Sequence, residues 1–340
     1  RKLLRDDDYA EVRPRLAAQC GEALARIHTI DPAAVHLDES DQLAFWEGIH
    51  RQIDDPHATF ELALRWLGAN RPRKARRAVV HGDFRNGNLL VDTERLQGVL
   101  DWELAHIGDP HEDLAWLCVR SWRFGEALPV GGFGPRDQLL AAYEAVAGHR
   151  VDRDALRWWE VFGCLRWGII CQIQVQSHLL GLQSLEQAAI GRRVAEAEYD
   201  VLLALPDGDQ LAGTITAPPD DDVERGVHDR PTAAELADAV RHFVTSDVAE
   251  ATTGRTHHLT RVAANVLSMI ERELALGPTQ QLRQRARLDR LGAADERALA
   301  ASIATGELDG RSDELTATLF EATLDKLSVA NPDYVEDRHR

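Results

Sequence analysis

The chain has 340 residues, of which 44% are hydrophobic and 28% are charged, and its formal net charge is −17 at pH 7. The acidic balance argues against a nucleic-acid partner, which would require a basic face, and no apolar run approaches the ~20 residues that span a bilayer. We therefore expect a globular protein of about two domains, with neither nucleic acid nor membrane as a partner.

The first third of the chain carries helical patterns. Apolar residues recur at intervals of three or four over residues 9–30, which is typical of one amphipathic helix. Asp31-Pro32 should end this helix, because the residue before a proline resists helical geometry. Residues 41–69 predict one or two further helices, with a break near Asp55-Pro56.

Short apolar runs follow, each too short for a helix and bounded by turn residues, and they predict strands. These runs are Ala78–His81, Asn88–Val91 and Gln97–Leu100. After Asp109-Pro110 the pattern becomes helical again. We expect these helices near residues 112–121, 136–147, 154–178 and 183–204.

The composition changes after residue 205. Residues 206–231 are rich in Asp, Gly and Pro and have little apolar periodicity, so they predict a linker. The chain beyond them is helical and has no strand signal. We therefore predict three parts, which are residues 1–205, the linker at 206–231, and an all-α domain at 232–330.

The predicted all-α domain has clear start and stop signals. Thr232 and Glu235 have the spacing of a capping box, which satisfies the first free amides of a helix. Gly277-Pro278, Gly292 and Asn331-Pro332 are the expected helix stops. The apolar faces of these helices must be buried in a bundle core, in a homodimer through this domain, or against a partner protein.

Two compositional features concern the compartment and the chain's ends. None of the four cysteines forms a C-x-x-C pair and all lie in apolar helical contexts, which predicts reduced core cysteines in a cytoplasmic protein. The chain begins with Arg1 and has a single methionine, Met269. This start predicts a fragment or a processed chain.

The segment AVVHGDFRNGNLLVD, residues 78–92, places a polar loop between two apolar runs. His81, Asp83 and Asn88 in this loop follow the spacing H-x-D-x-x-x-x-N, and Asp101 comes directly after the third run. Because the runs are close in sequence, a hairpin-like pairing would bring Asp83, Asn88 and Asp101 to one end of a small sheet.

This set of side chains suits phosphoryl transfer. The reaction needs a carboxylate that orients a hydroxyl and accepts its proton, together with oxygen ligands for Mg²⁺. Asp83 suits the first task, and Asn88 and Asp101 suit the second. Arg85 can place a guanidinium beside the transferred phosphoryl group.

The segments HGDFRNGNLLVD and VLDWELAHIGDPHEDLAW resemble the aminoglycoside phosphotransferase family, which has the protein-kinase-like fold. The sequences of these two segments are most similar to those of the subgroup that is fused to acyl-CoA dehydrogenases. The resemblance covers residues 9–204 and implies an α+β, mostly helical fold, a kinase-like C-terminal lobe with small β hairpins that precedes the separate all-α domain. It also implies ATP and Mg²⁺ as cofactors.

The resemblance carries roles over to individual residues. Asp83 takes the position of the catalytic base, and Asn88 and Asp101 take the positions of the Mg²⁺ ligands, with Glu103 assisting the metal. Together with His81, which braces the loop, Asn88 and Asp101 form the predicted cofactor-binding set.

The resemblance also bears on the phosphate contact and on the substrate. Arg85 occupies the place where many protein kinases carry a phosphate-contacting lysine. The implied substrate is a small molecule with a hydroxyl group, either a hydroxyacyl compound or an aminoglycoside-like one. The family's N-terminal lobe, with its nucleotide-covering loop and strand lysine, has no counterpart in this chain's residues.

Two alternatives to an ATP-dependent small-molecule kinase stay open at this point. The missing lobe suggests a non-catalytic, pseudokinase-like binding protein. Histidines and carboxylates between residues 81 and 113 could instead form the metal cluster of a hydrolase, although their spacing matches no common signature.

Overall fold

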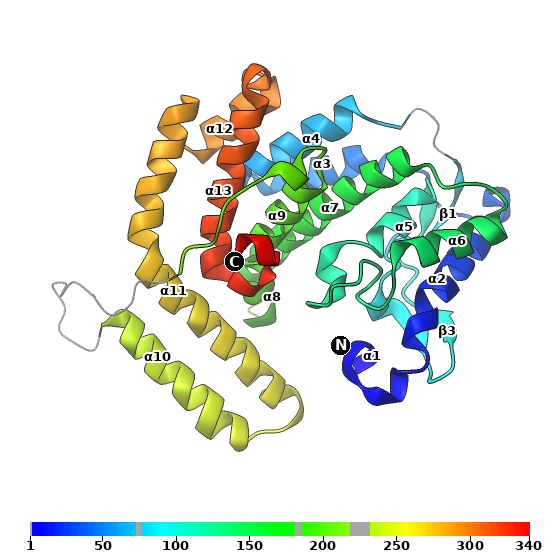
Figure 1. Cartoon of the computed structure of the whole chain (residues 1–340), viewed down its shortest axis with the longest axis horizontal. Helices are drawn as coiled ribbons and strands as arrows, with labels where there is room; N and C mark the ends of the chain where they lie inside the picture. Colours follow the sequence, from blue (N-terminus) through cyan, green and yellow to red (C-terminus); the bar gives the residue numbers. More distant parts are fainter. Residues whose placement is uncertain (1, 73–75, 181–184, 218–231) are drawn as a thin grey trace. The chain divides into compact units, whose positions relative to one another are not determined.

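The computed structural model describes residues 2–72, 76–180, 185–217 and 232–340. These residues are mostly helical, with a few short strands (Figure 1). The strands are β1 (Ala78–Val80), β2 (Leu89–Val91), β3 (Leu96–Val99) and β4 (His106–Gly108). The helices are α1 (Lys2–Arg5), α2 (Arg13–His28), α3 (Gln42–Ile53), α4 (Ala58–Ala69), α5 (His111–Trp116), α6 (Arg136–Ala147), α7 (Arg153–Leu179), α8 (Leu185–Gly191), α9 (Val194–Ala204), α10 (Ala233–Phe243), α11 (Gly254–Leu291), α12 (Glu296–Thr305) and α13 (Ser312–Ala330). The predicted mostly helical α+β class with an all-α tail is confirmed.

The chain divides into two compact units. Unit 1 comprises Arg1–Gly48 and Ala63–Arg166, and unit 2 comprises Ile49–Leu62 and Trp167–Arg340. These units divide the chain at other places than the predicted domains, whose boundaries stay a prediction. The greater part of the predicted linker, residues 218–231, lies outside the described residues.

Unit 1 contains two small antiparallel sheets. β1 pairs with β4, and β2 pairs with β3 in a hairpin. The three predicted strands are confirmed within one residue at each end. β4 was not predicted, because its three residues include a single aliphatic side chain, and it becomes a strand through its pairing with the buried β1.

The helical part of unit 1 is organised by the contact between α2 and α6. The apolar stripe of α2 is buried, with Leu16, Cys20 and Leu24 fully inaccessible. A Cβ atom built on Gly21 would lie 2.2 Å from the carbonyl oxygen of Leu139 in α6. Glycine at this position therefore allows the two helices to pack closely.

Unit 2 has its own core, in which α9, α11, α12 and α13 meet. Tyr199 and Phe320 stack at its centre, with ring centroids 5.7 Å apart, and Leu327 is fully buried beside them. The hydroxyl of Tyr199 also lies 2.7 Å from Nδ1 of His339 near the chain's C-terminal end. In Figure 1, α10 and the first part of α11 lie side by side as a helical hairpin.

The predicted signals in this helical part are mostly confirmed. Thr232 and Glu235 form the capping box, and Gly292 ends α11 with a left-handed φ of 77°. Gly277-Pro278 was predicted as a helix stop, and this prediction is wrong because α11 continues through Pro278. A proline costs about 3 kcal/mol inside a helix, and packing of α11 along α10 and α13 offsets that cost. A homodimer through this part stays a prediction.

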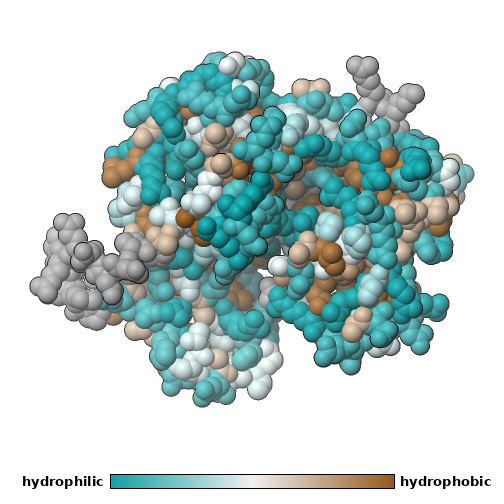
Figure 2. All heavy atoms as spheres, viewed as in Figure 1, coloured by the Kyte–Doolittle hydropathy of each residue, from teal (hydrophilic) through white to brown (hydrophobic). Residues whose placement is uncertain are grey.

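The cysteines are buried and the visible surface is mostly hydrophilic, as the composition predicts. Cys20, Cys118, Cys164 and Cys171 are free and buried, as expected for core residues, and the cytoplasmic location stays a prediction. The face seen in Figure 2 is mostly hydrophilic. None of the described helices combines the length and hydropathy that a membrane span requires.

An ion cluster around the buried Glu198 of α9 joins His57, which directly precedes α4, to Lys326 of α13 within unit 2. Glu198 Oε1 lies 2.9 Å from Nδ1 of His57, and Lys326 donates to both carboxylate oxygens of Glu198. Burial alone would raise the pKa of Glu198, but Lys326 and His57 outweigh it and lower that pKa to about 2. Burial alone would lower the pKa of His57, but hydrogen bonds with Asp55 and Glu198 raise it to about 9.

This cluster should make unit 2 less stable in alkaline solution. The pKa of His57 is raised on folding, so its contribution is complete below ~6.5 and is lost as the pH rises through about 9. When the pH is raised from 6 to 9.5, we expect the free energy of unfolding of the wild type to fall. This fall should be about 2 kcal/mol larger than that of the His57→Gln variant. Urea unfolding at both pH values measures the difference, and equal losses would show that His57 is not coupled to Glu198.

Candidate active site

The polar loop lies between β1 and β2, and its backbone is fixed from α5. Asp113, which is fully buried, accepts the backbone N–H of His81 at 2.8 Å and that of Gly82 at 2.9 Å. Gly82 has a φ of 79°, and a Cβ there would lie 2.4 Å from the carbonyl oxygen of Leu104. The loop therefore begins in a tight turn that only glycine fits and that a buried carboxylate holds.

The carboxylate of Asp83 is the centre of the candidate site. Its Oδ1 accepts hydrogen bonds from Nε1 of Trp116 at 2.8 Å and from Nε of Arg85 at 3.0 Å. Its Oδ2 accepts one from Nδ2 of Asn88 at 2.7 Å. The side chain is 14% exposed, so three donors orient the carboxylate while one edge stays accessible.

Asn88 and Asp101 lie at the same end of the β2–β3 hairpin. The N–H of Leu100, at the end of β3, donates to the carbonyl oxygen of Asn88 at 2.8 Å. The amide nitrogen of Asn88 is committed to Asp83, so its Oδ1 is left without a donor among the residues that the structure describes. Asp101 has a left-handed φ of 67° and is exposed, as is Glu103.

These oxygen atoms fit a divalent cation chemically. Mg²⁺ takes carboxylate and amide oxygens as ligands and keeps several water molecules. Neither Asp101 nor Glu103 forms an ion pair within the described part of the chain, so both carboxylates are available. Asn88, Asp101 and Glu103 are therefore the residues that could hold a metal beside Asp83, and their roles stay predictions.

His81 ties the loop to the neighbouring hairpin. Its Nδ1 accepts the backbone N–H of Asp83 at 3.2 Å, and its Nε2 lies 3.0 Å from the carbonyl oxygen of Leu100. The residue is fully buried. Because both ring nitrogens are used within the fold, the geometry favours bracing, and a direct contact of His81 with a nucleotide stays a prediction.

Arg85 lies against the predicted base. Besides its bond to Asp83, its guanidinium packs 4.9 Å from the centroid of the Trp122 ring. A Cβ on Gly87 would lie 2.3 Å from Nη1 of Arg85, so glycine leaves room for this side chain. The structure thus places Arg85 beside the carboxylate, and its contact with a phosphoryl group stays a prediction.

Sequence reasoning missed Trp116, which donates to Asp83, and the residues that pack against Trp116. Trp116 lies three positions after Asp113, on the same side of α5, and the ring of Trp116 packs 4.5 Å from the guanidinium of the buried Arg166. Arg166 pairs with Oε1 of Glu112 at 3.2 Å, and Oε2 of Glu112 lies 3.1 Å from Nε2 of His106. Burial lowers the pKa of Arg166 and the Glu112 carboxylate opposes that effect. The i, i+3 spacing in DLAW was the only sequence signal for Trp116.

The metal-hydrolase alternative finds no support in this geometry. His106 pairs with Glu112, and His111 Nδ1 lies 2.6 Å from Oδ1 of Asp109. Asp109 also accepts the backbone N–H of His111 at 3.0 Å, so its carboxylate is used within the fold. Within the described ranges, no group of three or more His, Cys, Asp or Glu residues is arranged to hold a metal ion.

Two family models match the chain. Residues 1–160 match the model described as "Phosphotransferase enzyme family". Residues 250–334 match a second model, described as a domain of unknown function (DUF6285). The first match contains the loop of Asp83 and the predicted metal ligands, and the second lies within unit 2.

Curated relatives are similar over part of the chain. Acyl-CoA dehydrogenase family member 10 of Mus musculus is 34% identical over 137 residues, which cover 37% of this chain and 13% of that protein. Homoserine kinase of Methylocella silvestris is 36% identical over 152 residues, which cover 41% of this chain and 45% of that protein. Viomycin phosphotransferase of Streptomyces vinaceus is 42% identical over 62 residues, which cover 16% of this chain and 22% of that protein. The chain spans less than half the length of each of these relatives.

A solved structure supports the fold. A protein from Ralstonia eutropha JMP134, assigned as an aminoglycoside phosphotransferase, superimposes with a TM-score of 0.51 at 23% identity, covering 60% of this chain and 68% of that one. This likeness confirms the predicted kinase-like fold.

Proposed function

We propose that this chain, whose residues 1–160 form a domain of the phosphotransferase enzyme family, belongs to an ATP- and Mg²⁺-dependent kinase that phosphorylates a hydroxyl group of a small molecule. The observation that carries the proposal is the carboxylate of Asp83, which Trp116 and Asn88 orient and which stays partly accessible. A fixed, accessible carboxylate is what a hydroxyl needs in order to be oriented and deprotonated.

Asp83 acts in this reaction by accepting a proton. The substrate oxygen attacks the γ-phosphorus, the bond from that phosphorus to the β-phosphate oxygen breaks, and the hydroxyl proton passes to the carboxylate. The substrate hydroxyl replaces Nε of Arg85 as a hydrogen-bond donor to the Asp83 carboxylate. Arg85, once displaced, is free to pair with the phosphoryl oxygens, which a guanidinium binds well.

The hairpin end supplies the metal ligands. When bound, Mg²⁺ neutralises the negative charge of the phosphates. Oδ1 of Asn88 and the carboxylate of Asp101 would hold it, with Glu103 assisting. The bond from Asn88 to Asp83 keeps the base and the metal ligand at a constant separation.

The substrate is, in our proposal, a hydroxylated acyl or other lipid-derived compound rather than an aminoglycoside. The sequence of the Asp83 loop and the similarity to acyl-CoA dehydrogenase family member 10 support this choice. Similarity to homoserine kinase and to viomycin phosphotransferase supports a small acceptor in general.

The proposal predicts that ADP is released only when a suitable hydroxyl compound is present. The test offers hydroxyacyl-CoAs, other hydroxylated metabolites and aminoglycosides to the full chain with ATP and Mg²⁺. We expect turnover with a hydroxyacyl compound, and the same compound without its hydroxyl group is the matched control. ATP binding without turnover on any acceptor would favour the pseudokinase-like alternative.

A further inference from the structure

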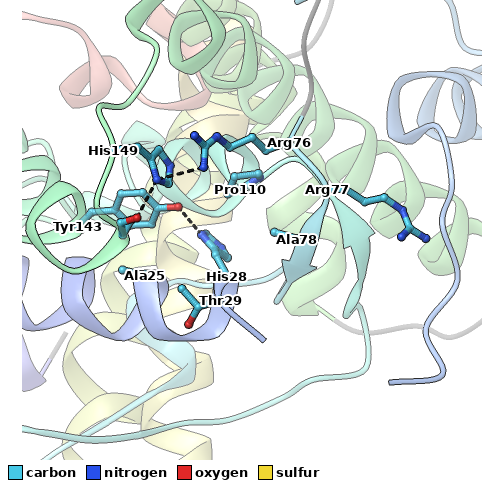
Figure 3. Close-up of a pocket in the computed structure, with 10 residues that line it drawn as sticks. Ala25, His28, Thr29, Arg76, Arg77, Ala78, Pro110, Tyr143 and His149 are labelled. Carbon is cyan, nitrogen blue, oxygen red and sulfur yellow. Dashed lines mark hydrogen bonds between the residues drawn. The ribbon is translucent and has the colours of Figure 1, made fainter. Parts of the chain in front are cut away.

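Unit 1 contains a cavity of about 220 Å³, whose lining residues include none from the Asp83 loop. Figure 3 shows that α2, the start of β1, α6 and the residues after α6 surround it. Ligand pockets for drug-sized molecules hold roughly 300–1,000 Å³. The size of this cavity therefore indicates a small ligand.

Arg76 brings a positive charge to the cavity, and its guanidinium faces a histidine. Nη1 of Arg76 lies 3.1 Å from Nδ1 of His149, and Nδ1 of His149 also lies 2.9 Å from the carbonyl oxygen of Ala147. A carbonyl oxygen accepts and a guanidinium donates, so Nδ1 cannot satisfy both at once. Within the part of the chain that the structure describes, Arg76 has no carboxylate partner.

The neighbouring Arg77 also lines the cavity, but its guanidinium is directed elsewhere. Its side chain points away from Arg76 and His149 in Figure 3 and pairs with Glu39 at 2.8 Å. Arg76 is thus the guanidinium on this segment whose charge faces the cavity.

A chain of hydrogen bonds leads from the cavity wall to the Asp83 loop. The hydroxyl of Tyr143 lies 3.0 Å from Nδ1 of His28, and Nε2 of His28 lies 3.1 Å from Oδ2 of Asp113. The Asp113 carboxylate can only accept, so in a neutral His28 the proton is on Nε2 and Nδ1 accepts from the Tyr143 hydroxyl. Asp113 in turn holds the backbone amides of His81 and Gly82.

We propose that this cavity binds a small phosphate-class oxyanion between Arg76 and His149, and that its occupation tightens the Asp83 loop through Tyr143, His28 and Asp113. The anion supplies the negatively charged partner that Arg76 lacks among the described residues. The source is either free phosphate or the phosphate group of a small metabolite. This proposal does not rest on the proposed kinase activity.

Calorimetric titration of the full chain with inorganic phosphate, at constant ionic strength set with chloride, tests the site. We expect Arg76→Ala and His149→Ala to weaken phosphate binding by about 10-fold or more. Arg77→Ala removes the same charge one residue away and should bind within about 2-fold of the wild type. A parallel titration with glycerol 3-phosphate separates the sources, since tighter binding of the ester indicates a metabolite.

Hydrogen exchange tests the coupling. Saturating phosphate should slow exchange at the amides of His81 and Gly82 several-fold in the wild type and leave it unchanged in Arg76→Ala. Loss of binding in Arg77→Ala equal to that in Arg76→Ala would overturn the site. So would loss in Arg85→Ala, which would place the anion at the Asp83 loop. Binding without slower exchange at these amides would overturn the coupling.

Discussion

Asp83→Asn is expected to lower phosphoryl transfer by about 10²- to 10⁴-fold, the range that a positioned general base contributes. The asparagine has nearly the same shape, and its oxygen can still accept from Trp116 or Asn88. It cannot accept the hydroxyl proton, so substrate binding should change little while kcat falls. Rates of ADP release at saturating ATP, with the acceptor found by the screen, measure this loss.

Two further variants make the result specific. Asp7→Asn removes one exposed carboxylate elsewhere in unit 1 and should leave kcat unchanged. Trp116→Phe removes one of the donors to Asp83 but keeps the aromatic packing, so we expect an intermediate loss of about 10-fold. Undiminished turnover in Asp83→Asn would refute Asp83 as the base, whatever the other variants do.

The local parts of the site could be predicted from sequence. The H-x-D-x-x-x-x-N spacing and the apolar runs around it placed Asp83 and Asn88 on one loop, because a short strand on each side leaves the chain few paths. The hairpin of β2 and β3 then brings Asn88 and Asp101 to one end, as a pairing of neighbouring runs implies. Each of these predictions depends on residues that are close in the chain.

The parts that could not be predicted depend on distant residues. Trp116 reaches Asp83 from 33 positions away, and Arg166 reaches Glu112 from 54 positions away. No spacing rule connects such residues, because their contact depends on how the helices pack. The continuation of α11 through Pro278 has the same cause, since packing against α10 and α13 outweighs the local preference.

Asp113→Ala is expected to destabilise unit 1 strongly. It removes the acceptor of the His81 and Gly82 amides and of His28, and it leaves these buried donors unpaired. Breaking a buried, hydrogen-bonded charge in this way costs about 3–5 kcal/mol. Urea unfolding at pH 7 measures the loss, and the loop that carries Asp83 should lose its protection from hydrogen exchange in the same variant.

The pH dependence tells whether the charge of Asp113 or its shape is responsible. Burial alone would raise the pKa of Asp113, but the hydrogen bond and charge of His28 and the His81 amide outweigh it and lower that pKa. Its stabilising contribution is therefore present above the ordinary aspartate value of ~3.9 and is lost as the pH falls through the lower folded value. We expect Asp113→Asn to lose part of the stability at pH 7 and to lack this acid-dependent loss.

A third variant separates the two sides of the Asp113 clamp. His28→Gln removes the imidazole but leaves both backbone amides bonded to Asp113, so it should cost less than Asp113→Ala, about 1–2 kcal/mol. If His28→Gln destabilised unit 1 as much as Asp113→Ala, the amide bonds would contribute nothing. The loop would then owe its position to the imidazole alone, and the backbone clamp inferred for His81 and Gly82 would be wrong.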